Sequence, residues 1–128
     1  MTPETITIAR TGDRPLQFTG ALIIAAEAWT GDRGHTLTLY QHPAGFVVTV
    51  EYQTNYDHEP YHCAAYTGAT IADIAAALQA HDPLVHFRGF PAHRDYREKQ
   101  ARLAANLTAS YHAAVSELLA DFPETLEA

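Results

Sequence analysis

The chain has 128 residues, of which 47% are hydrophobic, and a formal net charge of −7. This length suits one domain with a single core, and the hydrophobic content argues against a disordered chain. The acidic balance argues against a general nucleic-acid coat protein, which needs a basic surface. The single cysteine, Cys63, cannot form an internal disulfide bond, which suits a reducing compartment. We therefore expect one cytoplasmic domain spanning residues 1–128.

Neither a secretory signal nor a membrane span is predicted. The N-terminal sequence MTPETITIAR lacks a basic region followed by an apolar one. The longest apolar run, residues 21–26, is far shorter than the roughly 20 residues that a helix needs to cross a bilayer. We therefore expect no membrane partner.

Two strands are predicted at the start of the chain. Residues 5–9 alternate polar and apolar side chains, and turn residues follow between Gly12 and Pro15. Residues 16–29 contain enough Ala to permit a helix, but their β-branched and aromatic side chains favour a strand. We interpret them as a long second strand, bent or bulged near Gly20.

The clearest pattern lies between residues 36 and 53, which predict two strands joined by a tight turn at residues 42–45. If Gln41 pairs with Phe46, one face is apolar and the other carries mostly Thr, Tyr and Glu. A shift by one residue would expose the apolar set, so the register is well specified. The apolar face carries Leu37, Leu39, Val48 and Val50.

A fifth strand is predicted at residues 61–67, after a polar loop. Pairing Gln53 with Pro60 would place Tyr61, Cys63 and Ala65 on the apolar face. Cys63 would then be an inert thiol in the core.

The remainder is predicted to be helical. Thr70 and Asp73 form a capping-box pattern, and Pro83 ends the first helix. The second helix runs from about His93 to Asp121, and its ~28 residues span roughly 42 Å. A compact domain of this size is only about 35 Å across. The helix should therefore overhang its sheet, kink, or pack on a second subunit, and we favour the last.

These elements predict an α+β fold, in which a five-stranded antiparallel meander precedes two C-terminal helices packed on one face, the last helix long. Apolar residues recur at spacings of three and four along the long helix. We assign the expected dimer interface to this stripe, using Tyr96, Leu103, Leu107, Tyr111 and Leu118.

Basic residues gather around the start of the long helix, where five of the eight Lys and Arg lie between residues 88 and 102. Three interpretations compete. The charges can form i,i+4 ion pairs on a solvated helix. Two long helices can pair antiparallel in a dimer, so that each basic start meets an acidic end. Alternatively, the helix start binds a phosphate or carboxylate with Arg88, His93, Arg94 and Arg97.

Other chemistry finds little support in the sequence. Eight histidines are present, and Asp57, His58 and His62 could share a metal ion if the fold added His81 or His86. We favour a polar loop beside a strand edge and predict no metal site. We expect no cofactor and no catalytic residue, because the chain has no G-x-S-x-G or glycine-rich phosphate-binding motif. Tyr40, Val47 and Tyr66 are placed on the sheet face away from the helices.

The resulting hypothesis is a small, cytoplasmic, non-enzymatic homodimer that acts through protein–protein interaction as a regulator or adaptor. The first alternative is a binder of an anionic ligand, or an enzyme acting on one, at the basic helix start. The second is single-stranded nucleic-acid binding on the open sheet face, against which the acidic balance counts.

Overall fold

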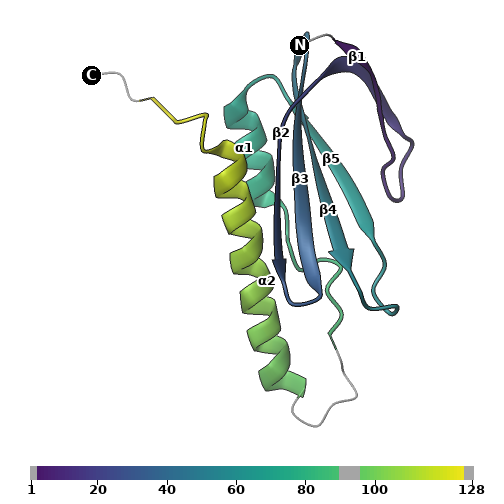
Figure 1. Ribbon diagram of the computed structural model, residues 1–128, viewed down its shortest axis with the longest axis vertical. Helices are drawn as coiled ribbons and strands as arrows, with labels where there is room; N and C mark the ends of the chain where they lie inside the picture. Colours follow the sequence, from purple (N-terminus) through teal and green to yellow (C-terminus); the bar gives the residue numbers. More distant parts are fainter. Residues whose placement is uncertain (1–2, 90–95, 126–128) are drawn as a thin grey trace.

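A computed structural model of the chain, in which residues 3–89 and 96–125 are described, contains one sheet and two helices (Figure 1). The five strands are antiparallel and neighbour one another in chain order, so the predicted α+β meander is confirmed. The elements are β1 (Glu4–Ile8), β2 (Leu16–Thr30), β3 (Arg33–His42), β4 (Gly45–Thr54), β5 (His62–Gly68), α1 (Ile71–Ala80) and α2 (Tyr96–Leu119).

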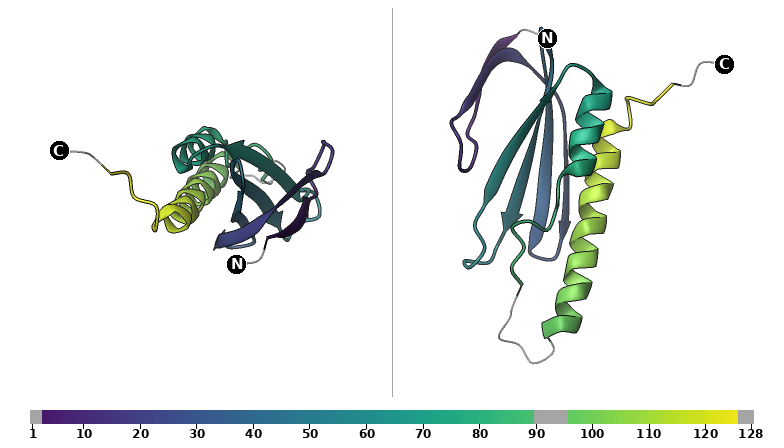
Figure 2. Two further views of the ribbon diagram at one scale, coloured as in Figure 1. Left: turned by 90° about the horizontal axis from the view of Figure 1, so that it is seen from above. Right: turned by 180° about the vertical axis from the view of Figure 1, so that it is seen from behind.

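Both helices lie on the same face of the sheet, as the view from above shows (Figure 2). α2 packs on β2 and β3, whereas α1 packs on β4 and β5. The core between these layers contains Leu37, Leu39, Val48 and Val50 from the sheet, Ile74 and Leu78 from α1, and Tyr111, Ala114 and Leu118 from α2. In the described residues, neither helix is long and apolar enough to cross a membrane.

The predicted register of the central hairpin is confirmed. Gln41 pairs with Phe46, and the two strands continue in step to the pair of Arg33 and Thr54. The apolar face of this hairpin is fully buried under the helices, and this one-sided burial produces the period-2 pattern of the sequence.

The predicted register of β5 is wrong by one residue. Cys63 pairs with Glu51, and Ala64 pairs with Val50, so Cys63 lies on the face away from the helices. The reason is that the preceding loop is held by Glu59, a buried residue, and the strand begins only at His62. Cys63 is nevertheless buried, as expected for an inert thiol.

β2 is shared between two partners. Its residues 16–20 pair with β1, and its residues 21–30 pair with β3, with a register shift between Leu22 and Ile24. The change of partner occurs at Gly20, where an added Cβ would collide with the carbonyl oxygen of Gln41. The predicted long strand with an irregularity near Gly20 is therefore confirmed.

The hairpin of β1 and β2 curls over the sheet face that carries no helix (Figure 2). Its turn is fixed to β5, because the Thr11 amide donates to the Cys63 carbonyl and the Cys63 amide donates to Thr11 Oγ1, both at 3.0 Å. This cover leaves Val47 only 2% exposed and also buries Thr49. The face that we expected to be open is thus reduced to a hollow, and Tyr66 lies on the other face, against His81 of α1.

The helices largely follow the sequence signals. Thr70 caps α1 with the expected capping box, in which Asp73 reaches back to the Thr70 amide. α2 has 24 residues in the described part of the chain and spans roughly 36 Å. Its fully buried residues begin at Leu107, and its first turns extend past the end of the sheet (Figure 1).

We predict that Gly20→Ala destabilises the protein by roughly 1–3 kcal/mol, because β2 must move away from the Gln41 carbonyl. Urea denaturation measures this change. The neighbouring exposed substitution Thr19→Ala is the control, with an expected effect within about 0.5 kcal/mol. Equal stability of Gly20→Ala and wild type would contradict the close approach of the two strands.

Candidate protein interface

The second half of β2 forms an edge of the sheet. Over residues 21–30, the described part of the chain places β3 on one side of the strand and no strand on the other. The unpaired N–H and C=O groups of such an edge are a template for another strand. Natural proteins commonly blunt an edge with Lys, Pro, a bulge or inward-pointing charge. Residues 16–30 contain neither Lys nor Pro, and Glu27 is their one charged residue, so the register shift between Leu22 and Ile24 is the one irregularity that interrupts this edge in the described structure.

The exposed side chains on this edge are mostly apolar, and Glu27 is the charged exception. Leu22 is 48% exposed and Trp29 is 40% exposed, while Ala25 between them is also exposed. The Trp29 ring lies over the backbone of Gly34, where an added Cβ would come within 2.6 Å of the ring. In the described structure, the edge therefore offers a mostly apolar strip beside backbone groups that no strand pairs.

The opposite edge of the sheet is β5, and some of its outward backbone groups already form hydrogen bonds. β5 is crossed at Cys63 by the turn of the β1–β2 hairpin, whose Thr11 takes up both the amide and the carbonyl of that residue. Two of the backbone groups of this edge are thus already paired. Of the two sides of the sheet, the second half of β2 is the more available.

α2 lies directly beside this edge, since it packs on β2 and β3. Its flank toward α1 includes Leu119, which lines a groove with residues of that helix. At 100° per residue, the opposite flank is displaced toward the β2 side. We call it the outer flank of α2; it consists of Lys99, Leu103, Asn106, Ala113 and Glu117. Ser110 lies on the same side of the helix, but its Oγ is buried in the protomer.

Three of the predicted interface residues are buried inside the protomer. Leu107, Tyr111 and Leu118 are fully buried, and the Tyr111 hydroxyl donates to the Leu78 carbonyl at 2.6 Å. A partner that docks on the folded protomer does not reach them. Tyr96 and Leu103 are half-buried. The spacing of apolar residues correctly identified one buried stripe of α2. The same spacing is expected whether the stripe packs on its own sheet or on a second subunit, so it could not distinguish the two.

The predicted anion site is only partly described. Arg88 and Arg97 are exposed, whereas His93 and Arg94 lie outside the described residues. The main-chain amides of Arg88 and Gly89 donate to Glu59 Oε2, at 2.7 and 3.3 Å. Since those amides already hold a carboxylate of the protein, they are not free to bind a ligand.

Sequence reasoning missed this buried carboxylate. Glu59 is 3% exposed, and its Oε1 accepts from Arg33 Nε at 2.7 Å and from the hydroxyls of Tyr52 and Thr54. Burial alone would raise the pKa of Glu59, but the bonds from Arg33, the Arg88 amide and Thr54 favour the carboxylate, so its pKa is lowered. The arrangement joins the β4–β5 loop to residues 88–89 and is structural.

Four histidines gather where β3, β5 and the segment after α1 meet. The rings of His62 and His86 stack with centroids 3.7 Å apart, and His81 Nδ1 lies 2.6 Å from the Tyr66 hydroxyl. In the described residues, no three His, Cys, Asp or Glu side chains are placed to hold a metal ion. The rings of the cluster contact one another and the rings of Tyr52 and Tyr111.

His35 is the most deeply buried member of the cluster, with 1% exposure. Burial, assisted by the charge of His81, lowers its pKa to about 4, while the Pro83 carbonyl opposes the shift. Burial also lowers the pKa of His81 and of His86. In the described structure, His35 Nδ1 has no hydrogen-bond partner, which fits a neutral ring.

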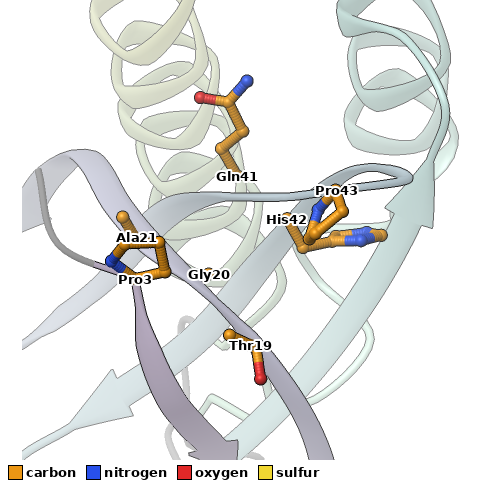
Figure 3. Close-up of a pocket in the computed structure, with 7 residues that line it drawn as sticks. All are labelled: Pro3, Thr19, Gly20, Ala21, Gln41, His42 and Pro43. Carbon is orange, nitrogen blue, oxygen red and sulfur yellow. The ribbon is translucent and has the colours of Figure 1, made fainter.

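A pocket of about 420 Å³ surrounds Gly20 (Figure 3). Thr19 and Ala21 flank the glycine on β2, and His42 and Pro43 approach from the β3–β4 turn. Among the described residues, no Asp, Glu, Lys or Arg lines this pocket. It lies at the bend where β2 changes partner from β1 to β3.

No protein-family model, curated protein or solved structure matches this chain in the comparisons made.

We predict that stability falls between pH 6.5 and pH 4, because the unfolded chain binds a proton at His35 that the folded protein excludes. Because the pKa of His35 is lowered to about 4 in the folded protein, the free energy of unfolding falls by up to about 3 kcal/mol on acidification. This loss of stability is absent above pH 6.5 and complete near pH 4. Urea denaturation at pH 7 and pH 4 measures the loss.

In the variant His35→Leu, the fall in the free energy of unfolding between pH 7 and pH 4 should be smaller by about 3 kcal/mol. His112→Leu removes an exposed histidine of α2 and should leave the loss unchanged. The same pH dependence in wild type and His35→Leu would exclude His35 as its source.

Proposed function

We propose that the protein is a cytoplasmic, non-enzymatic homodimer that acts through protein–protein interaction. The open apolar edge of β2 carries the proposal. Two copies of residues 22–29 pair antiparallel about a two-fold axis, which joins two sheets into one and pairs the backbone groups of both edges. The reducing cytoplasm suits the free, buried thiol of Cys63.

The position of α2 supports a second copy as the occupant of this edge. α2 packs on both β2 and β3. A helix axis midway between these strands lies about 2.4 Å inside β2, and the two-fold axis of a strand pair lies about 2.4 Å outside it, because neighbouring strands are about 4.8 Å apart. The two copies of α2 are then about 10 Å apart, which is a packing distance for helices. A strand from an unrelated protein on the same edge would lack a second α2 to pack against the first.

The predicted antiparallel pairing of basic and acidic helix ends does not follow from this strand pair. Tyr111 contacts His35, and His35 pairs with Ala28, so a two-fold axis between Ala25 and Ala26 crosses α2 on the C-terminal side of Tyr111. That axis does not bring Lys99 to Glu117 of the partner subunit.

The expected mass in solution is twice the 14.1 kDa of the chain. Light scattering over a micromolar concentration series measures this mass. Ala25→Lys should raise the dimer dissociation constant by about tenfold or more, because it places two like charges near the axis of the strand pair.

The matched control is Thr67→Lys, which puts the same side chain at an exposed position of β5, on the opposite edge. It should leave the mass unchanged. A monomer at high micromolar concentration, or equal effects of the two lysines, would contradict the proposed dimer.

A further inference from the structure

A small hollow lies between the β1–β2 hairpin and the sheet face that carries no helix. Its volume is about 260 Å³, just below the roughly 300–1,000 Å³ of sites for drug-sized ligands. The hairpin forms its roof and is held in place by the two hydrogen bonds between Thr11 and Cys63. The lining includes Ile8 from the hairpin and Tyr40, Thr49, Glu51, Tyr61 and Cys63 from the sheet side.

Glu51 supplies the one carboxylate of this lining. It is half-buried, and its Oε1 accepts a hydrogen bond from the Tyr61 hydroxyl at 2.6 Å. In the described residues the ion pairs are Arg10 with Asp13 and Arg33 with Glu59, so no cation of the protein balances Glu51. A partly buried carboxylate without a countercharge attracts a cation from solution.

The other lining groups suit the same kind of ligand. Burial raises the pKa of Tyr40 and of Tyr61, and the charge of Glu51 raises both further, so the two phenols stay neutral. Neutral phenol rings attract a cation to their faces, and hydroxyl oxygens accept hydrogen bonds from its N–H groups. The thiol of Cys63 also stays protonated, because burial raises its pKa.

The ligand class follows from size and charge. A carboxylate beside aromatic rings repels anions, and the described residues gather no three ligands for a metal ion. We propose that the hollow binds a small primary-ammonium compound, with its charged nitrogen against Glu51 between Tyr40 and Tyr61 and its short alkyl part toward Ile8. This site is independent of the β2 edge and of the proposed dimer.

Three probes of equal length test the proposal: n-butylamine, n-butanol and butyrate, titrated into the full chain at neutral pH and followed by amide NMR. The amine should shift the resonances of Tyr40, Thr49 and Glu51 saturably, with millimolar affinity for a ligand of about five heavy atoms. The alcohol and the acid should not saturate. Equal binding of amine and alcohol, or no saturable shift with the amine, would overturn the proposal.

Glu51→Gln keeps an oxygen that accepts the Tyr61 hydrogen bond but removes the charge, so it should weaken amine binding by about tenfold or more. Glu4→Gln is the matched control, because Glu4 is an exposed strand carboxylate of β1 that lies outside the β2 edge and does not line the hollow. It should bind the amine as wild type does. Unchanged amine affinity in Glu51→Gln would show that this carboxylate is only a structural partner of Tyr61.

Discussion

The division of β2 between β1 and β3 is the constraint on which the rest of the structure depends. The strand is 15 residues long, and it changes partner at Gly20, where the backbone of Gln41 approaches too closely for any side chain. Because β1 stops at the bend, the sheet cannot continue beyond the second half of β2. The first half instead turns away with β1 and covers the other face of the sheet.

Two consequences of that bend have opposite chemical character. The hairpin encloses a small polar hollow around Glu51, while the second half of β2 keeps an apolar edge with free backbone groups. In a monomer, the backbone groups of this edge form hydrogen bonds with water, so their exposure has a low energetic cost. Pairing the edge with another strand removes Leu22 and Trp29 from water and adds a ladder of hydrogen bonds. The core under α2 is complete without a partner, so the edge and the outer flank of α2 are what a second copy can use.

The sequence predicted the features that depend on local periodicity. Leu37, Leu39, Val48 and Val50 alternate with polar residues and have one acceptable register, and the Thr70 capping box determines where α1 begins. The register of β5 could not be obtained in this way, because a buried loop residue, Glu59, decides where pairing begins. The partners of Glu59 come from residues 33, 52, 54, 88 and 89, and no local pattern connects them.

The candidate sites were less predictable for the same reason. The apolar stripe of α2 was visible, but only the fold shows that Tyr111 belongs to the core. The central claim is that residues 22–29 of β2 are paired with a second copy in solution. Amide hydrogen exchange as a function of protein concentration tests it most directly. The account predicts that the outward-facing amides of this segment are protected at high concentration and lose protection on dilution, while β3 stays protected throughout. Rapid exchange of these amides at every concentration would contradict it.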